Sequence, residues 1–472
     1  MILLVLSSIV LEWFLVASIS LVCGSVDRRF LWCGICFFWF CSKNSYSVDM
    51  YLIYWKWKVG LAVAALCDLQ GISYEICDDA NQPSSYESYD VVIPSPGIPS
   101  SHPIYKTGRV MCELDFAYQF LPKDFQIISV TGTDGKSTTA WIMYNILEKE
   151  FSVKKSVYLS GNFDIPFSET VLHILQKWEK KWIIVVEISS FMAYGIKKYQ
   201  SDYSIFTNFK PDHLNWHADL QEYLDAKMNL IQRTKNRSII NDQIIQFAWE
   251  NSLTMSLPLY ARVFENTLMM KDGTDGLDIK ISWRRKYSLS DTNFSGIHNA
   301  MNILSCVLVA NEMKICSKRT REYLKSIQWL PHRLEVIWVK HGITIVEDSK
   351  STSSQSLAAA LGSFGNTQNL LLIVWGSDKW DHFDQLAPLL KSRVIALVCI
   401  GATKDQFIQI AKQAHIPYLS TDILSEGVQW LYKQGHENDV LMLSPGCASF
   451  WLFRDYFDRA NQFREAIKNL PK

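Results

Sequence analysis

The stretch Ser129-Val-Thr-Gly-Thr-Asp-Gly-Lys-Ser-Thr-Thr139 decides the fold of this 472-residue chain. An apolar run at residues 125–130 precedes it and is typical of a buried strand. Residues 140–150 follow, and their apolar side chains recur with the spacing of one helix face. A strand, a glycine-rich turn and a helix in this order are the parts of a phosphate-binding loop. The sequence therefore predicts an α/β nucleotide-binding domain around this stretch.

Four residues of this loop have the chemistry that phosphate binding needs. Gly132 and Gly135 let the backbone turn tightly and aim its N–H groups inward, next to the positive end of the helix. Lys136 can reach the β- and γ-phosphates of a nucleotide, and Ser137 can ligate Mg²⁺. Val130 stands where the common form of the loop has its first glycine. The alternative is an ordinary strand-to-helix turn that contains Gly-Lys-Ser by chance.

Length and composition limit the possible classes of protein. The length suggests about three domains, and 48% apolar residues are enough for sizeable cores. Lys and Arg together number 47, as do Asp and Glu, so the balanced charge argues against nucleic acid as a partner. Eleven cysteines are scattered, and Cys33-x-x-Cys36 has no second His or Cys pair to complete a zinc site. We expect reduced cysteines, as in a cytoplasmic protein.

Residues 1–50 differ in composition from the rest of the chain. Residues 1–22 are almost continuously apolar and long enough to span a bilayer, and a second apolar run covers residues 30–41. A basic start and a clear cleavage site, which mark a cleaved signal peptide, are both missing from this segment. Two interpretations stay open: a segment foreign to the protein, from a mis-assigned start or a frameshift, or a membrane anchor. We expect no membrane contact unless residues 1–50 are genuine.

Residues 51–115 have the pattern of a partial Rossmann-like domain. Residues 59–93 read as a helix that ends in a glycine cap, followed by two strands. Asp78 comes directly after the first of these strands, where an acidic side chain can bind a ribose. Residues 54–58, Tyr-Trp-Lys-Trp-Lys, stand in place of the expected glycine-rich turn. We therefore expect an incomplete domain whose first strand and phosphate loop are lost; a scaffold without a ligand is the alternative.

Residues 116–329 form the expected central domain around the phosphate loop. A buried strand ends in Glu187, and a carboxylate at a strand end near such a loop suits Mg²⁺, although it could simply terminate the strand. Residues 203–208 read as another strand, which leads into a polar loop with two histidines. His213 is the better ligand candidate because it lies at the strand end directly after an aspartate. His217 is more typical of a structural histidine.

Four further polar residues of the central block have no role that the pattern alone assigns. Lys227 lies on an amphipathic helix at residues 220–234, where a lysine is usually solvated. Asn299 and Asn302 are three residues apart and share one face of a predicted helix. Their amides could bind a purine edge or a ribose, or they could cap the helix. Asn162 lies in a turn-rich segment.

Residues 330–472 alternate strands and helices, which predicts a doubly wound parallel sheet. The expected strands cover residues 342–347, 369–375, 393–400 and 439–444, and the expected helices cover residues 354–364, 403–413 and 423–433. Ligands of such sheets bind at the carboxyl ends of the strands. Hydroxyls and two lysines at these ends indicate an anionic ligand, although the hydroxyls could be helix caps. They belong to Asp348-Ser-Lys-Ser-Thr352, Gly376-Ser-Asp-Lys379 and Ser444-Pro-Gly-Cys-Ala-Ser449.

Taken together, these motifs resemble those of the Mur ligases of peptidoglycan synthesis, from about Gly60 to the C-terminus. The shortened Thr-Gly-Thr-x-Gly-Lys-Ser loop is this family's form of the phosphate-binding loop. The motif Ser444-Pro-Gly-Cys-Ala-Ser-Phe450 resembles that of the branch of the family that adds D-glutamate. This motif distinguishes that branch from the sister Mur ligases and from folylpolyglutamate synthetase. The resemblance rests on Thr131-Gly-Thr-Asp-Gly-Lys-Ser-Thr138, Glu187-Ile-Ser-Ser-Phe191, Asp212-His213, Asp225-Ala-Lys227, His298-Asn-Ala-Met-Asn302, Pro331-His-Arg333, Asp348-Ser-Lys-Ser-Thr352, Asp378-Lys379 and Ser444-Pro-Gly-Cys-Ala-Ser-Phe450.

The resemblance implies three domains: an incomplete Rossmann-like domain for the UDP substrate, a central P-loop ATPase and a C-terminal Rossmann-like domain. It implies an ATP-dependent amide ligase that adds D-glutamate to UDP-N-acetylmuramoyl-L-alanine through an acyl phosphate, with ATP and two Mg²⁺ ions as cofactors. It further implies a monomeric, cytoplasmic enzyme whose partners are these small molecules. The alternatives are a related Mur or folylpolyglutamate-type ligase with a different acceptor, and a non-catalytic or decayed nucleotide-binding protein.

The resemblance also implies roles for individual residues. Ser137 and Glu187 match ligands of the first Mg²⁺ ion, and His213 matches a ligand of the second. Lys227 matches a lysine that the family carbamylates, which turns a cation into an anion that supports the second metal. The ATP-binding set is Gly132, Thr133, Asp134, Gly135, Lys136, Ser137, Thr138, Asn299, Asn302, Arg333 and Asp348. The catalytic set is Lys136, His213, Lys227 and Lys350.

The substrate sites follow from the same resemblance. Lys379 would pair with a carboxylate of D-glutamate, while neighbouring hydroxyls donate hydrogen bonds. Asn162 matches a contact to the muramoyl part of the substrate, and Asp78 matches a contact to its uridine end. The whole substrate-binding set is Asp78, Asn162, Thr352, Lys379, Ser449 and Tyr456.

Four residues depart from the family's usual pattern. Asp134 replaces an Asn in the phosphate loop, which adds negative charge near the phosphates. Ser353 replaces an Asn that usually follows Thr352, and Tyr456 stands where a Phe is common. Ala80 falls where an Arg can help the uridine site.

Overall fold

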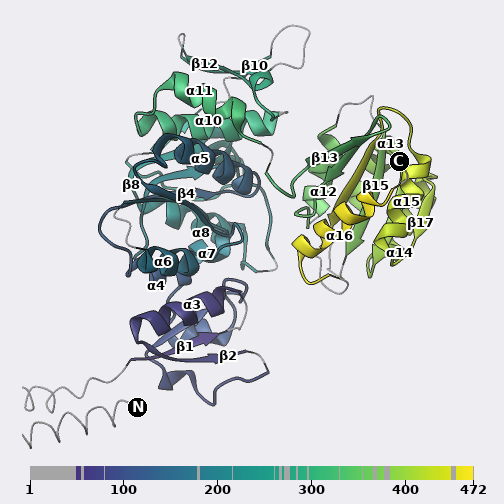
Figure 1. The fold of residues 1–472 in the computed structure, drawn as a ribbon. Helices are drawn as coiled ribbons and strands as arrows, with labels where there is room; N and C mark the ends of the chain where they lie inside the picture. Colours follow the sequence, from purple (N-terminus) through teal and green to yellow (C-terminus); the bar gives the residue numbers. More distant parts are fainter. Residues whose placement is uncertain are drawn as a thin grey trace, which may run out of the picture.

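The computed structural model contains three α/β units in chain order, with the N-terminal unit at one end of the central unit and the C-terminal unit at its side (Figure 1). It describes residues 49–54, 58–78, 80–177, 181–214, 216–259, 261–264, 268–270, 277–282, 285–294, 297–328, 330–352, 354–364, 369–376, 383–447 and 453–470. The expectations for residues 1–48, Lys379 and Ser449 lie outside these ranges. Within them, no helix combines the length and the apolar character that crossing a bilayer requires.

The N-terminal unit is built on a parallel three-stranded sheet of order β2-β1-β3. Its elements are β1 (Met50–Tyr54), α3 (Lys58–Gln70), β2 (Ser73–Cys77) and β3 (Val91–Pro94), with short 3-10 turns at Tyr86–Ser88 and Pro103–Thr107. The expectation that the first strand is lost was wrong. Met50-Tyr-Leu-Ile-Tyr54 alternates side chains into cores on both faces of the sheet, so it occupies the central position.

The central unit contains a parallel six-stranded sheet of order β5-β6-β4-β7-β8-β9. The strands are β4 (Phe125–Thr131), β5 (Ser156–Gly161), β6 (Trp182–Glu187), β7 (Ser201–Phe206), β8 (Thr234–Asn241) and β9 (Ala261–Phe264). Chain order reverses around β4, whose neighbours are β6 and β7. The crevice at the carboxyl end of β4 is therefore the expected ligand position in such a sheet.

Helices cover both faces of this central sheet. One core joins the sheet to α5 (Lys136–Phe151), α10 (Ile297–Glu312) and α11 (Ser317–Ser326). The opposite face is covered by α4 (Glu113–Tyr118), α6 (Phe167–Gln176), α7 (Ser190–Tyr194) and α8 (Leu220–Gln232), and α3 of the N-terminal unit shares this second core. The remaining elements are α9 (Asp242–Glu250), the 3-10 turn Leu289–Asp291 and the antiparallel strands β10 (Leu268–Met270), β11 (Leu277–Ser282) and β12 (Arg285–Ser288).

The C-terminal unit has a six-stranded sheet of order β13-β14-β18-β15-β16-β17. Its strands are β13 (Glu335–Lys340), β14 (Ile343–Glu347), β15 (Leu370–Gly376), β16 (Val394–Gly401), β17 (Tyr418–Ser420) and β18 (Val440–Gly446). Its helices are α12 (Ser354–Gly362), α13 (Ala387–Arg393), α14 (Lys404–Ala414), α15 (Leu424–Gln434) and α16 (Tyr456–Lys468), with a 3-10 turn at Phe383–Leu386. The predicted doubly wound sheet is confirmed. The antiparallel edge strand β13 was not predicted.

Candidate active site

The phosphate loop has the shape that its two glycines permit. Gly132 has a φ of +151° and Gly135 a φ of +74°, a conformation that side chains rarely adopt. A Cβ atom at Gly132 would lie 1.9 Å from Thr207 Oγ1, and one at Gly135 would lie 2.6 Å from Asn302 Oδ1. The loop is therefore packed between the segment after β7 and the start of α10. The side chain of Asn302 packs directly against Gly135 of this loop.

Lys136 begins α5 and folds back over its own loop. Its Nζ donates to the carbonyl oxygens of Gly132 and Thr133, at 3.0 and 2.7 Å. Burial lowers the pKa of this lysine, while the carboxylates of Glu187 and Asp134 oppose that shift. The ammonium thus sits in a site of low solvent access, where a charge acts more strongly on a phosphate than it would in water.

Glu187 provides a carboxylate beside the loop. It ends β6, where it pairs in register with Val130 of β4, and it is only 1% exposed. Its Oε1 accepts from Asn162 Nδ2 at 2.8 Å. Its Oε2 is buried without a hydrogen-bond partner among the described residues. A buried carboxylate oxygen that lacks a partner is costly, and a cation is the group that would satisfy it.

His213 and His217 have different surroundings. His213 has a φ of +56°, and its Nε2 lies 3.4 Å from Asp212 Oδ2. Burial lowers the pKa of His213 to about 4; the positive charge of Lys136 adds to this shift, and Asp212 opposes it. The ring is therefore neutral at pH 7 and keeps a lone pair for a metal ion. His217 instead packs on aromatic rings and forms a hydrogen bond with Ser190 Oγ at 2.9 Å, which fits a structural role.

Lys227 projects from α8 beneath the phosphate loop and is 1% exposed. Its Nζ donates to the Gly132 carbonyl at 2.7 Å and lies 4.6 Å from the centre of the Tyr223 ring. Burial lowers the pKa of this lysine well below its usual range, and the charge of Lys136 lowers it further. The neutral amine is the form of lysine that reacts with CO₂, so this environment fits a carbamate.

Asp134, which had no physical explanation in the sequence, has partners in the segment after β7. Its carboxylate Oδ2 lies 3.0 Å from Lys210 Nζ, with both side chains more than half exposed. Its backbone N–H donates to Asn208 Oδ1 at 2.8 Å, and its carbonyl accepts from Thr207 Oγ1 at 2.7 Å. The extra negative charge is therefore paired by Lys210 at the rim of the loop. Sequence reasoning missed this lysine because nothing in its local pattern marks it.

The C-terminal unit reaches the phosphate loop through Arg333, whose Nη2 donates to Ser137 Oγ at 3.2 Å. Asp348 holds the adjoining turn, because its Oδ1 accepts from the Leu334 N–H at 3.1 Å and its Oδ2 from Ser444 Oγ at 2.8 Å. Burial raises the pKa of Asp348 to about 7, although these hydrogen bonds and Arg333 oppose the shift.

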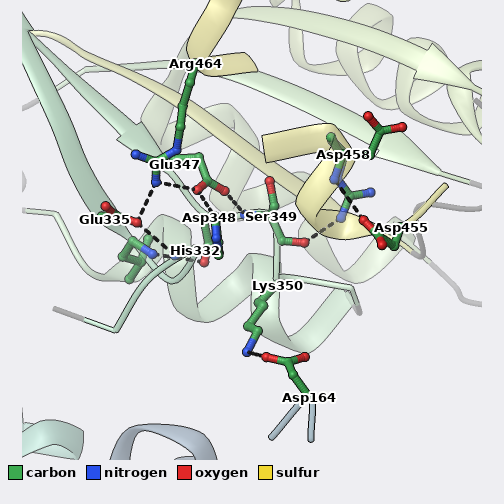
Figure 2. Close-up of polar contacts among 12 residues, drawn as sticks. Asp164, His332, Glu335, Glu347, Asp348, Ser349, Lys350, Asp455, Asp458 and Arg464 are labelled. Carbon is green, nitrogen blue, oxygen red and sulfur yellow. Dashed lines mark hydrogen bonds and ion pairs between the residues drawn. The ribbon is translucent and has the colours of Figure 1, made fainter. Parts of the chain in front are cut away.

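An acidic cluster lies behind this turn (Figure 2). Glu347 is fully buried; its Oε2 lies 2.5 Å from His332 Nδ1 and accepts from Arg464 Nη2 at 3.0 Å. The same Arg464 nitrogen donates to Glu335 at 2.7 Å. His332, Glu335 and Glu347 are close enough to hold a metal ion. Since Arg464 already supplies the positive charge between the two carboxylates, we assign this cluster to the support of the Arg333 turn.

Lys350 points away from that cluster toward the central unit (Figure 2). Its Nζ lies 2.7 Å from Asp164 Oδ2, 4.5 Å from the centre of the Phe163 ring and 5.1 Å from that of Tyr456. Burial, followed by the Asp164 carboxylate, raises the pKa of Tyr456. The structure therefore brings Lys350 and Tyr456 together, at the boundary between the C-terminal and central units.

The contacts of the remaining predicted residues do not test their proposed roles. Asp78 accepts hydrogen bonds from the N–H groups of Ala80 and Asn81 in its own turn, far along the chain from the phosphate loop. Asn299 lies beside Asn302, whose Nδ2 donates to it at 3.5 Å. Thr138 and Thr352 are half-buried. Their roles stay predictions, as do those of Lys379 and Ser449, which lie outside the described residues.

Comparisons with known proteins bear on the same region. Residues 130–310 match the family described as Mur ligase middle domain. The chain is 30% identical to the UDP-N-acetylmuramoylalanine–D-glutamate ligase of Aquifex aeolicus, over 89% of this chain and 98% of that protein. The chain belongs to the Mur ligase family.

Other relatives agree with this assignment. The ligase of the same name from Hydrogenobaculum sp. is 30% identical over 89% of this chain and 98% of its own length. Among solved structures, MurF ligase from Thermotoga maritima in complex with ADP has a TM-score of 0.56 at 16% identity, covering 90% of this chain and 96% of that one. UDP-N-acetylmuramate-alanine ligase MurC from the same organism has a TM-score of 0.56 at 14% identity, covering 89% and 99%. These two structures show that the Mur ligase fold is shared.

Proposed function

We propose that this chain is an ATP-dependent ligase that joins D-glutamate to UDP-N-acetylmuramoyl-L-alanine, a step of peptidoglycan synthesis. The alignments of the chain with two relatives of this name cover nearly the whole length of each relative. The observation that carries the proposal is the buried Oε2 of Glu187, which has no hydrogen-bond partner in the described part of the chain and lies beside a phosphate loop that also contains Lys136 and Ser137. Such a site is prepared for a nucleotide with its metal ion rather than for a neutral ligand.

The residues present fit two Mg²⁺ ions. Ser137 and Glu187 would hold one ion, because one carboxylate oxygen of Glu187 has no partner among the residues that the structure describes and Ser137 has a hydroxyl in the loop. His213, neutral at pH 7, and a carbamate on Lys227 would hold the other. When bound, the ions neutralise charge as the phosphoryl group moves between ATP and the substrate carboxylate.

The carbamate itself needs only CO₂ and the neutral amine. The Lys227 nitrogen lone pair attacks the carbon of CO₂, and a proton leaves the nitrogen, which leaves a negatively charged carbamate. Burial favours the uncharged amine at the start of this reaction. The product places two oxygen atoms beneath the loop, where a cation can stabilise them.

Ligation proceeds in two steps. An oxygen of the substrate's alanyl carboxylate attacks the γ-phosphorus of ATP, the bond to the bridging oxygen breaks, and ADP leaves an acyl phosphate behind. The amine of D-glutamate then attacks the acyl carbon and gives up a proton, and inorganic phosphate leaves as the amide forms. Lys136 and Arg333 would stabilise the phosphoryl charge, since both reach the phosphate loop.

The D-glutamate site is proposed at the carboxyl edge of the C-terminal sheet. Lys350 and Tyr456 meet there at the boundary with the central unit, and Thr352 follows in the same segment as Lys350. Hydroxyl and ammonium donors of this kind suit the carboxylates of an amino acid. Lys379 would supply a further cation for the same ligand.

Phosphate release from ATP tests the proposed function. We expect release when UDP-N-acetylmuramoyl-L-alanine and D-glutamate are both present, and a large decrease when either is left out. Glu187→Gln should reduce the rate about 100-fold or more because it removes the carboxylate charge, while Glu169→Gln, on the exposed face of α6, should not. Release that does not depend on D-glutamate but requires another amino acid would contradict the proposal that D-glutamate is the amino acid added. If the wild-type protein releases no phosphate in response to the substrates, the proposed ligase activity is wrong.

A further inference from the structure

Asp164 connects all three units of the structure. It lies in the loop between β5 and α6 of the central unit, and its carboxylate pairs with Lys350 of the C-terminal unit, with 2.7 Å between Oδ2 and Nζ. The backbone carbonyl of the same residue accepts a hydrogen bond from Lys58 Nζ at the start of α3 in the N-terminal unit. No motif in the sequence singled out this residue.

The backbone of Asp164 adopts an unusual conformation. Its φ is +72°, in the left-handed region that glycine occupies freely and other residues occupy only rarely. Asp and Asn tolerate this region better than most side chains. A non-glycine residue that is held there suggests that its side chain has a use that offsets the strain.

The Asp164–Lys350 pair is sheltered from water. The side chain of Lys350 is 12% exposed and that of Asp164 is 25% exposed. The rings of Phe163 and Tyr456 lie next to the ammonium of Lys350, with centres 4.5 and 5.1 Å from Nζ. An ion pair in such surroundings is screened less than one on the open surface, and its geometry is fixed by the rings that pack around it.

The same loop also contacts the proposed metal site. Asn162, two residues before Asp164, donates to Glu187 Oε1 at 2.8 Å. The Gly161 N–H donates to the Ile165 carbonyl at 2.7 Å, which closes the loop on itself. One short loop therefore joins Glu187, at the end of β6, to Lys350, in the segment that follows β14. A shift of this loop would change the distance between the two.

We propose that Asp164 is a positioning residue that sets Lys350 of the C-terminal unit against the phosphate and metal site of the central unit. This inference rests on the proposed function, because it assumes that Lys350 acts near the reacting groups. Asp164 itself acts through Lys350 and need not touch a substrate. The strained left-handed backbone of Asp164 is tolerated because its carboxylate holds the ammonium of Lys350 in place across the boundary of the two units.

Two variants of Asp164 distinguish an effect of its carboxylate from an effect of its backbone conformation. Asp164→Asn removes the charge and keeps a side chain that tolerates φ +72°, and Asp164→Gly removes the whole side chain and relieves the backbone. Both should lower kcat about tenfold or more, since losing a sheltered charge-assisted contact is worth at least one tenfold step, while the KM for ATP changes less than about threefold. Asp422→Asn is the matched control, because it removes an exposed ion pair with Lys404 inside the C-terminal unit.

A second readout does not depend on turnover. Brief treatment with acetic anhydride, followed by peptide mass spectrometry, measures how accessible the amine of Lys350 is, with the exposed Lys412 as internal reference. We expect faster acetylation of Lys350 in both Asp164 variants and no change in Asp422→Asn. Equal melting temperatures of variants and wild type would exclude general unfolding as the cause.

The outcomes are distinct. A kcat within twofold of wild type in both variants, or unchanged acetylation of Lys350, would overturn the positioning role. A decrease in kcat for Asp164→Asn but full activity for Asp164→Gly would overturn it as well, because the backbone rather than the carboxylate would then be responsible. If the wild-type enzyme shows no D-glutamate-dependent activity, the proposed function fails, and the acetylation experiment alone decides whether Asp164 holds Lys350.

Discussion

Replacing Lys227 with methionine tests the least ordinary part of the proposed chemistry. Methionine keeps an apolar side chain of similar length in the buried site and removes the nitrogen. The Gly132 carbonyl then loses the donor that now lies 2.7 Å away. Lys136 Nζ still donates to this carbonyl at 3.0 Å. Losing one of its two hydrogen bonds costs about 0.5–1.5 kcal/mol, so the melting temperature should fall by only a few degrees. Loss of the carbamate should reduce the D-glutamate-dependent rate about 100-fold or more, as for other preorganised charges.

The assay compares phosphate release in buffer stripped of CO₂ with release after bicarbonate is added. Wild-type activity should fall in the stripped buffer and recover with bicarbonate, whereas Lys227→Met should stay inactive in both. Lys235→Met, at an exposed position on β8, is the control and should behave as wild type. Mass spectrometry under gentle conditions should find wild-type protein heavier by one CO₂. Substantial activity of Lys227→Met, or an active wild type that does not respond to CO₂, would refute the carbamate.

Three further predictions concern the loop and its supports. Lys136→Ala should lose about 100-fold or more in kcat, measured by phosphate release, because phosphoryl charge is no longer stabilised; near-normal turnover would remove its proposed role. Lys210→Met should raise the KM for ATP by no more than about fivefold, as expected for an exposed pair, and the double variant with Asp134→Asn should return to the wild-type KM. Burial raises the pKa of Asp348 from 3.8 to about 7, so its carboxyl favours folding at low pH and loses that contribution between pH 3.8 and 7. Asp348→Asn should therefore gain stability relative to wild type as the pH rises from 4.5 to 8, in urea unfolding at each pH; an unchanged difference would contradict the buried, protonated form.

Local patterns predicted the elements that carry the chemistry. The strand before the phosphate loop, the helix after it, and the strand that ends in Glu187 have periodicities that the fold reproduces as β4, α5 and β6. The doubly wound order of the C-terminal unit followed from the same alternation of strands and helices. Each single strand or helix is encoded within about ten to twenty consecutive residues, where hydrophobic period and capping residues are strong signals.

Other features depend on the tertiary structure and left no local signal. Asp164 and Lys350 are 186 residues apart in the chain, and Asp134 and Lys210 are 76 apart. Neither pair is marked by spacing or composition. The first strand of the N-terminal unit was missed for a different reason: Tyr51 and Tyr54 face opposite cores, so the strand does not alternate apolar with polar residues.

The product of the reaction is the most direct test of the central claim. The purified enzyme is incubated with UDP-N-acetylmuramoyl-L-alanine, Mg²⁺, ATP and either D- or L-glutamate, and the nucleotide fraction is analysed by mass spectrometry. We predict a new species heavier than the substrate by one glutamate less one water, formed with D-glutamate and only when ATP is present. Formation of that species equally well from L-glutamate, or its absence while ATP is hydrolysed, would contradict the proposed function.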